Sequence, residues 1–252
     1  KGYSITILDN LSEQIHGNNP ENTSPLYNSI KGKVKFIKTS INSKKDLETA
    51  ISDNDIIVHY AAETGTGQSM YQIAKYTEVN ILGTALLLDI LTNSKHNIKK
   101  VVVASSRSIY GEGKYFSEEF GNVYPEHRTS EYLDKKDFEV KYPDTKYLKL
   151  LPTDENSKLH PSSVYGITKL NQEQMVMTVC KAINIPSVAF RYQNVYGPGQ
   201  SLSNPYTGIL SIFSTQILNG NAINIFEDGK ETRDFVYIDD VVEATILGIE
   251  NN

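Results

Sequence analysis

Tyr165 and Lys169, a tyrosine and a lysine one helical turn apart, are the pair in this sequence best suited to acid–base chemistry. They lie near the start of a segment with apolar residues at helical spacing, which Pro161 and two serines precede, so both side chains project from one face of an expected helix. A phenol titrates near pH ~10, and an ammonium group one turn away favours the phenolate. Taken alone, the pattern also fits a surface tyrosine and lysine without a chemical role, so the rest of the chain must decide.

The composition narrows the class of protein. The chain has 252 residues, 22% of them charged, and a net charge of −5 without a Lys/Arg-rich run, which argues against nucleic-acid binding. A single cysteine, Cys180, excludes an intrachain disulfide framework and a multi-cysteine zinc site, and fits a reducing compartment such as the cytoplasm. Cys180 is expected to be a small core residue. The five histidines lack metal-ligand spacing and no apolar run approaches the length of a membrane span, so we predict no metal and no membrane contact.

Apolar strands alternate with helices along most of the chain. Strands are predicted at residues 2–10, 34–38, 55–62, 100–106 and 186–192, and helices at 45–52, 73–92 and 161–183. This alternation predicts an α/β fold, a doubly wound parallel sheet with helices on both faces.

Two regions depart from this rhythm. Residues 10–30 are polar and are predicted to be a loop. Residues 111–160 have no clear period and are too many for a plain loop, so we predict an insertion with small elements of its own beside or over the site. Near the C-terminus we expect a loop and helix, two short strands and a last helix, at 204–218, 221–226, 234–238 and 239–249. We predict two domains. Residues 1–190 form the larger one, and residues 191–252 form a smaller, partial lobe.

Six motifs follow one another along the chain: His59-x-Ala61-Ala62, Asn80-x-x-Gly83-Thr84, Ala104 to Gly111, Tyr165-x-x-x-Lys169, Arg191 to Gly199, and Arg233-Asp234-Phe235-Val236. Together they resemble the extended short-chain dehydrogenase/reductase family, in its NAD-dependent nucleotide-sugar epimerase/dehydratase branch, over essentially the whole chain. The stretches 63–70 and 204–208 look most like the sugar-nucleotide 4-epimerases. The resemblance implies a Rossmann-like fold, NAD as cofactor, and a UDP- or dTDP-linked sugar as substrate.

The catalytic roles come from this resemblance. It implies that Tyr165 is the base and acid acting on the sugar O4, that Lys169 holds the nicotinamide ribose and lowers the tyrosine pKa, and that Ser106 hydrogen-bonds the same oxygen. The implied reaction is epimerisation at C4 through a transient 4-keto sugar: the C4 hydride passes to NAD and returns to the other face, so NAD is not consumed. His59 is expected to be a packed strand residue, not a catalyst.

Further positions are implied to contact the cofactor. Asp9 ends the first strand, where an acid in a dinucleotide-binding fold binds the adenine ribose hydroxyls and selects NAD; a strand-end Asp that caps a loop is the alternative. Where relatives usually carry an Asp that contacts adenine, this chain has Thr39-Ser40-Ile41-Asn42. The full set of implied cofactor residues is Asp9, Asn10, Ser40, Ile41, Tyr60, Ala61, Ala62, Asn80, Tyr165 and Lys169.

Two later residues match positions that contact the nucleotide diphosphate of the substrate in the family. These are Asn194 and Arg233, which join Ser106 as implied substrate contacts. A guanidinium suits the role because it pairs with phosphate in a bidentate way. The alternative for Arg233 is a surface ion pair with Asp234 or Glu231.

Arg107 and Ser108 distinguish this chain from the 4,6-dehydratases of the family, in which Asp-Glu directly follows the catalytic Ser/Thr and eliminates water. Arginine cannot give up a proton at ordinary pH, so 4,6-dehydration is disfavoured. Decarboxylases of nucleotide-sugar acids also usually keep an acid near this place. Both points favour epimerisation.

The first strand of the family fold, and the Gly-x-x-Gly-x-x-Gly loop that binds the pyrophosphate after it, have no counterpart in this sequence. In the strand order 3-2-1-4-5-6 that strand lies in the middle of the sheet. We therefore expect a gap of about 9–10 Å between the two strands that would flank it. We also expect the chain to be a truncated or incompletely recorded form of a longer protein, and to bind NAD very weakly by itself.

The leading hypothesis is therefore a nucleotide-sugar 4-epimerase that makes precursors for surface polysaccharide. The alternatives are a reductase, dehydratase or decarboxylase of the same family, or a non-catalytic NAD-binding member. The resemblance also suggests a homodimer that pairs the Tyr165 helix and the helix near residues 73–92 with their mates.

Overall fold

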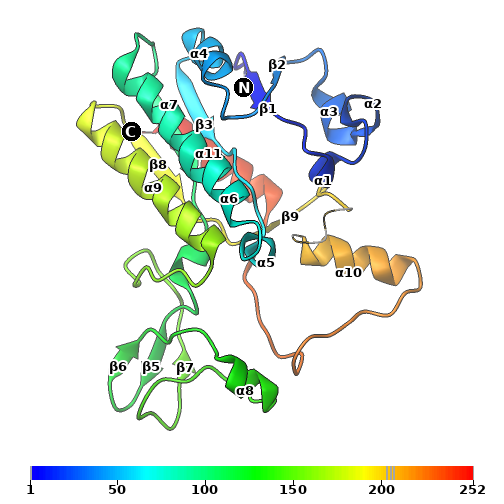
Figure 1. The fold of residues 1–252 in the computed structure, drawn as a ribbon, viewed down its shortest axis with the longest axis vertical. Coiled ribbons are helices and arrows are strands. Elements are labelled where there is room, and N and C mark those ends of the chain that lie inside the picture. The colour runs from blue at the N-terminus through cyan, green and yellow to red at the C-terminus, as the bar shows by residue number, and fades with distance from the viewer. Residues whose placement is uncertain (1, 203, 205, 207, 252) are drawn as a thin grey trace.

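A three-stranded parallel sheet forms the centre of the fold, shown in Figure 1 as a computed structural model that describes residues 2–202, 204, 206 and 208–251. The stretch 204–208 is therefore described only in part. The sheet has the order β3 (Ile56–His59), β4 (Lys100–Ala104), β8 (Ser187–Phe190). Val101, Val102 and Val103 of β4 are fully buried, as expected for a strand that is covered on both faces.

Helices cover both faces of this sheet. In Figure 1, α7 (Gly83–Asn93) and α9 (Val164–Ala182) lie side by side in front of the sheet, and α11 (Ile238–Glu250) lies behind it. Leu87, Val176 and Cys180 pack into the core between these helices and β4, which confirms Cys180 as a core residue. The predicted Rossmann-like α/β architecture is confirmed.

A separate pair of parallel strands, β1 (Thr6–Asp9) and β2 (Lys35–Lys38), lies beside the central sheet. Within the described residues no ladder joins β1 to β3, and a cavity of about 670 Å³ is lined by residues of both strands. Its walls include Ile5 and Ile7 on one side and Ile56 and Val58 on the other. The expected gap between these two strands is therefore present. α4 (Lys44–Ser52) packs against β1 and α7.

The helix predicted at 73–92 is continuous but not uniform. It comprises α6 (Ile73–Tyr76), a π-helical segment η1 (Thr77–Leu82) and α7. Gly83 lies at the junction of η1 and α7, so close to Ile41 that a Cβ on Gly83 would be 2.5 Å from the Cγ2 atom of Ile41. A side chain at position 83 would therefore force Ile41 to shift. A π-helical turn within a helix often marks a functional segment.

The loop predicted at residues 10–30 was a wrong prediction, because this stretch folds into α1 (Glu13–His16), α2 (Pro20–Thr23) and α3 (Pro25–Ile30). Ser24 caps α3 by accepting a hydrogen bond from Tyr27 N at 3.3 Å, and Pro25 occupies its first turn. The strand predicted at 221–226 was also wrong. That stretch has no regular structure, and Ile225 and Phe226 are exposed rather than packed on a partner strand.

The insertion at 111–160 forms a small lobe below the central body in Figure 1. It contains an antiparallel sheet of order β6 (Gly121–Val123), β5 (Tyr115–Ser117), β7 (Lys149–Leu150), and the helix α8 (Ser130–Asp134). The remaining elements are α5 (Thr66–Ser69), the 3-10 helix η2 (Arg107–Tyr110), α10 (Ile209–Leu218) and the parallel pair β9 (Asn194–Tyr196) and β10 (Phe235–Tyr237). None of the described helices is long and apolar enough to cross a membrane.

Candidate active site

The predicted pair Ser106 and Tyr165 meets where β4 ends and α9 begins. Ser106 caps η2 just beyond β4, and Ser163 caps α9 by accepting a hydrogen bond from Gly166 N at 3.1 Å. This cap puts Tyr165 in the first turn of the helix, where its backbone N–H donates to Ser69 Oγ at 3.0 Å. The Ser106 hydroxyl lies close enough to the Tyr165 phenol to lower the pKa of that phenol. The structure thus brings together two residues that lie 59 positions apart in the sequence (165 minus 106).

The electrostatic surroundings of Tyr165 differ in part from our expectation. Burial raises the pKa of the Tyr165 phenol, whereas the hydrogen bond from Ser106 and the nearby Arg107 guanidinium lower it. Lys169 lies one turn further along α9, but its Nζ donates to Gln172 Oε1 at 2.7 Å, and burial lowers the Lys169 pKa to about 7. In this structure, therefore, Ser106 and Arg107 favour the phenolate, and the action of Lys169 on the phenol stays a prediction.

A buried polar network holds Lys169. Gln172 Nε2 donates to Thr84 Oγ1 at 2.8 Å and lies 3.1 Å from His59 Nε2, which is 2.8 Å from the same Thr84 oxygen. Burial and the Lys169 charge lower the pKa of His59 to about 3, so its ring is neutral at ordinary pH. His59 is a packed strand residue, as predicted. Sequence reasoning missed Gln172, although its position one turn from Lys169 on the same helix was a usable signal.

Asn80 joins the loop after β3 to α9 and does not line the cavity between β1 and β3. Its Oδ1 accepts a hydrogen bond from Glu63 N at 2.7 Å, and its Nδ2 donates to Glu63 O at 3.1 Å and to Thr168 Oγ1 at 2.9 Å. The side chain is fully buried. Asn80 therefore fixes the turn after Ala61 and Ala62 relative to the helix that carries Tyr165.

The remaining implied cofactor residues lie together on the cavity between β1 and β3. They are Asp9, Asn10, Ser40, Ile41, Tyr60, Ala61 and Ala62. Asp9 Oδ1 accepts a hydrogen bond from Leu11 N at 2.7 Å, so the carboxylate also caps its loop, as the alternative interpretation expected. The Tyr60 hydroxyl lies 2.5 Å from Thr245 Oγ1 on α11 and 3.1 Å from the Tyr192 hydroxyl.

Asn194 is joined to the site through Arg107, whose Nε donates to Asn194 Oδ1 at 3.3 Å. Arg233 forms an ion pair with Glu231 at 3.0 Å, which is one of the two alternatives considered for it. Burial lowers the pKa of Arg107, and the charge of the nearby Arg233 lowers it further. The guanidinium groups of Arg107 and Arg233 repel each other, and together with the Asn194 amide they could bind an anion. Sequence reasoning used Arg107 only as an argument against dehydration and missed its position in the site.

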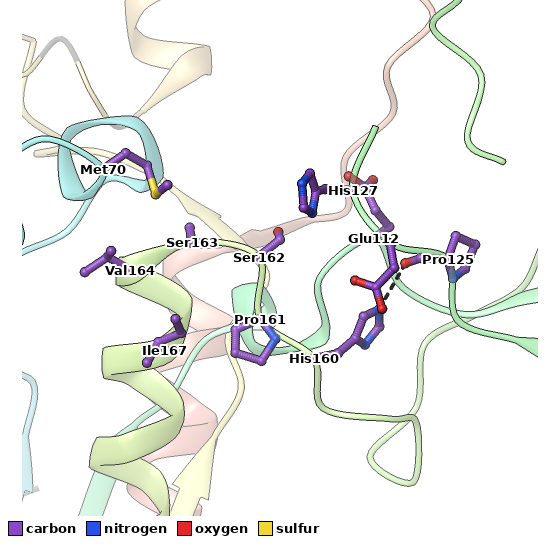
Figure 2. A pocket seen from close by; sticks show the side chains of 11 residues that line it. Met70, Glu112, Pro125, His127, His160, Pro161, Ser162, Ser163, Val164 and Ile167 are labelled. Carbon is purple, nitrogen blue, oxygen red and sulfur yellow. Dashed lines mark hydrogen bonds between the residues drawn. The ribbon is translucent and has the colours of Figure 1, made fainter. Parts of the chain in front are cut away.

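The insertion lobe reaches the start of α9, as predicted. Figure 2 shows a pocket of about 320 Å³ between the two, with Ser162 on one side and His127 and Glu112 on the other. His160 at its floor lies 3.3 Å from the carbonyl oxygen of Pro125. Gly111 passes so close to His160 that a side chain at this position would collide with its backbone. Across the part of the chain that the structure describes, no three His, Cys, Asp or Glu side chains form a group that could hold a metal.

Comparisons with known proteins agree with this arrangement. The family model described as "NAD dependent epimerase/dehydratase family" matches residues 1–136 and 141–252. The dTDP-L-rhamnose 4-epimerase of Burkholderia thailandensis is 36% identical over 243 residues, which cover 95% of this chain and 64% of that protein. A putative UDP-glucose 4-epimerase of Methanocaldococcus jannaschii is 30% identical over 250 residues, covering 98% of this chain and 66% of that protein.

Solved structures give the same result. The UDP-N-acetylglucosamine 4-epimerase from Methanobrevibacter ruminantium superposes with a TM-score of 0.71 at 28% identity, over 99% of this chain and 66% of that one. The UDP-glucuronic acid 4-epimerase from Bacillus cereus, in complex with UDP-glucuronic acid and NAD, superposes with a TM-score of 0.74 at 25% identity, over 99% and 66%. The chain thus spans about two thirds of the length of the relatives that it matches.

Proposed function

Because the chain belongs to the NAD-dependent epimerase/dehydratase family, we propose that it catalyses epimerisation at C4 of a nucleotide-diphosphate sugar through a transient 4-keto intermediate. The observation that carries the proposal is the Ser106–Tyr165 pair at the carboxyl end of β4, with Arg107 and Ser108 rather than two acids beside it. The named relatives at 36% and 30% identity are both described as 4-epimerases, which supports the same reaction.

The residues on the cavity between β1 and β3 suit NAD. Asp9 presents a carboxylate at a strand end, where it can accept hydrogen bonds from ribose hydroxyls, and Ala61 and Ala62 leave room beside the backbone. When bound, NAD supplies the acceptor and donor for the C4 hydride. We propose that Asp9 and Asn10 bind the adenosine end of the cofactor and that Tyr60, Ala61 and Ala62 line it.

Tyr165 takes and returns the proton of the sugar O4 in this proposal. Its phenol must lose a proton near neutral pH although burial raises its pKa, so the site needs groups that favour the phenolate. Ser106 supplies a hydrogen bond and Arg107 a positive charge. Lys169, with its own pKa lowered to about 7, would add a charge when it leaves Gln172 for the nicotinamide ribose.

Asn194 and Arg233 are proposed to bind the diphosphate of a UDP- or dTDP-linked sugar, with Arg107 between them and the catalytic pair. The ion pair of Arg233 with Glu231 is partly exposed, with side-chain exposures of 35% and 47%, so phosphate can replace it at small cost. A nucleotide sugar made in this way would serve polysaccharide synthesis.

A homodimer is proposed through the helices that the site rests on. α9 exposes Ile167 and Met177, α6 exposes Ile73 and η1 exposes Leu82. α6 and η1 both contact α9, so these apolar side chains offer surface to a second copy. Light scattering of the protein, with Ile167→Asp as the disruptive variant, tests this arrangement.

The test of the reaction is product analysis by mass spectrometry and proton NMR with a panel of UDP- and dTDP-sugars. We expect an epimer of unchanged mass, without net NADH formation or CO2 release. Loss of CO2 would show a decarboxylase, loss of water a dehydratase, and net NADH use a reductase. Tyr165→Phe should abolish turnover and leave NAD affinity unchanged, and a Phe variant with normal turnover would contradict the role of Tyr165.

A further inference from the structure

Both acceptor positions of the Ser106 hydroxyl are occupied by one residue, Ser108. The backbone N–H of Ser108 donates to Ser106 Oγ at 3.2 Å, and the Ser108 hydroxyl donates to the same oxygen at 2.9 Å. A serine hydroxyl has one proton to donate and two lone pairs to accept with. With both lone pairs engaged, the only hydrogen bond that Ser106 can still make is one in which it donates.

The neighbour placed to receive that remaining hydrogen bond is Tyr165, because α9 packs against η2 at this point. The Ser106 hydroxyl lowers the pKa of the phenol. This is the direction expected when Ser106 donates, because a donor stabilises the phenolate and an acceptor stabilises the protonated phenol. A Ser106 hydroxyl that can only donate is therefore suited to stabilise the phenolate of Tyr165.

We propose that Ser108 is a positioning residue for the reaction proposed above: its hydroxyl orients the Ser106 hydroxyl so that Ser106 donates toward the Tyr165 oxygen and the sugar O4. The proposal rests on that function for its chemical meaning, but its geometry does not depend on which sugar is bound. The backbone helps, since η2 begins at Arg107 and turns the chain so that Ser108 faces back toward Ser106.

Removal of the Ser108 hydroxyl frees one lone pair of Ser106. The Ser106 hydroxyl can then rotate and accept a hydrogen bond from the protonated phenol, which stabilises the form of Tyr165 that cannot act as a base. The other groups around Tyr165 stay in place. Arg107 from η2 lowers the pKa of the phenol, the Tyr76 ring from α6 has its centroid 6.4 Å from that of Tyr165, and Lys169 lies one turn further along α9.

The experiment compares Ser108→Ala with Ser105→Ala. Ser105 is the matched control, because it is a buried serine on the same stretch whose Oγ has no hydrogen-bond partner. In the NAD-bound protein we expect Ser108→Ala to move the acidic limb of the kcat–pH profile upward by about one pH unit and to lower kcat at pH 7 about tenfold, with KM nearly unchanged. Ser105→Ala should behave like the parent protein, and Ser108→Thr, which keeps a hydroxyl, should restore the profile.

A second readout does not require turnover. The phenolate absorbance of Tyr165, isolated as the difference between each protein and its Tyr165→Phe counterpart, should titrate at a higher pH in Ser108→Ala than in Ser105→Ala. Equal midpoints and equal kcat–pH profiles would overturn the proposal. If no sugar is epimerised, the proposed function fails, and this titration still decides the role of Ser108. The pair Ser108→Thr and Ser108→Val, equal in size, replaces the alanine variant if that variant does not fold.

Discussion

Replacement of Asn80 by alanine should uncouple the β3 loop from the catalytic helix. Asn80 makes hydrogen bonds to Glu63 N, Glu63 O and Thr168 Oγ1 at 2.7, 3.1 and 2.9 Å, and its side chain is fully buried. At about 1 kcal/mol net for each bond, Asn80→Ala should lower the free energy of unfolding by about 3 kcal/mol. For a chain of this size that corresponds to a fall in Tm of about 6 °C.

The same change should reduce turnover, because Thr168 lies between Tyr165 and Lys169 on α9. Its hydroxyl receives a hydrogen bond from Asn80 and donates to Tyr165 O at 2.9 Å. A shift of the catalytic phenol by a fraction of an ångström is expected to lower kcat roughly tenfold. Thr168→Val, which removes only the contacts of this hydroxyl, should give an intermediate loss of about 1–2 kcal/mol.

Urea denaturation followed by circular dichroism measures the stability, and product formation measures the turnover. Asn171→Ala is the matched control, since Asn171 also lies on α9 but its Oδ1 has no hydrogen-bond partner. We expect it to change the free energy of unfolding by less than about 1 kcal/mol. If Asn80→Ala is no more destabilising than Asn171→Ala, the reasoning that makes Asn80 the link between loop and helix is refuted.

Three further changes test the packing and charges around the site. Gly83→Ala should destabilise the protein by about 1–3 kcal/mol in thermal unfolding, because the new Cβ would be 2.5 Å from Ile41 Cγ2. Gly67→Ala is the control, since no atom lies within 4 Å of a Cβ there, and it should be neutral or stabilising. Equal effects of the two changes would rule out the steric explanation. Glu173→Gln breaks the ion pair between Glu173 and Arg191, which are 2.6 Å apart with side-chain exposures of 9% and 21%. In urea denaturation it should lower the free energy of unfolding by about 2–3 kcal/mol, whereas Glu131→Gln, at an exposed pair, should lower it by less than about 0.5 kcal/mol. Similar losses in the two variants would contradict this expectation. The Lys169 pKa of about 7 lies below its ordinary value of 10.5, so between these pH values the unfolded state binds more protons than the folded state. The free energy of unfolding should therefore rise as the pH rises through this window, and the Lys169→Met variant should lack that rise. An equal rise in the parent protein and in Lys169→Met would disprove this prediction.

Much of the fold follows from local patterns in the sequence. The apolar runs at 55–62 and 100–106 predict buried parallel strands because a strand that is covered on both faces has no polar side to show. The serine and proline before Tyr165 predict the start of α9, and Ser163 is its cap in the structure. The loop predicted at 10–30 and the strand predicted at 221–226 failed because short helices depend on individual caps, and strands depend on a partner that periodicity does not reveal.

The pair Tyr165-x-x-x-Lys169 and its resemblance to a family could be found by sequence alone, because helical spacing and motif order are one-dimensional properties. The direction of each hydrogen bond at the site could not be found by sequence alone. Only the tertiary structure shows that Lys169 is held by Gln172, that Asn80 bonds Glu63 and Thr168, and that Ser108 occupies both acceptors of Ser106. The Asn80 bonds join residues from separate elements. The physical effect of all three relations depends on burial and distance, which arise only when β3, β4 and α9 pack together.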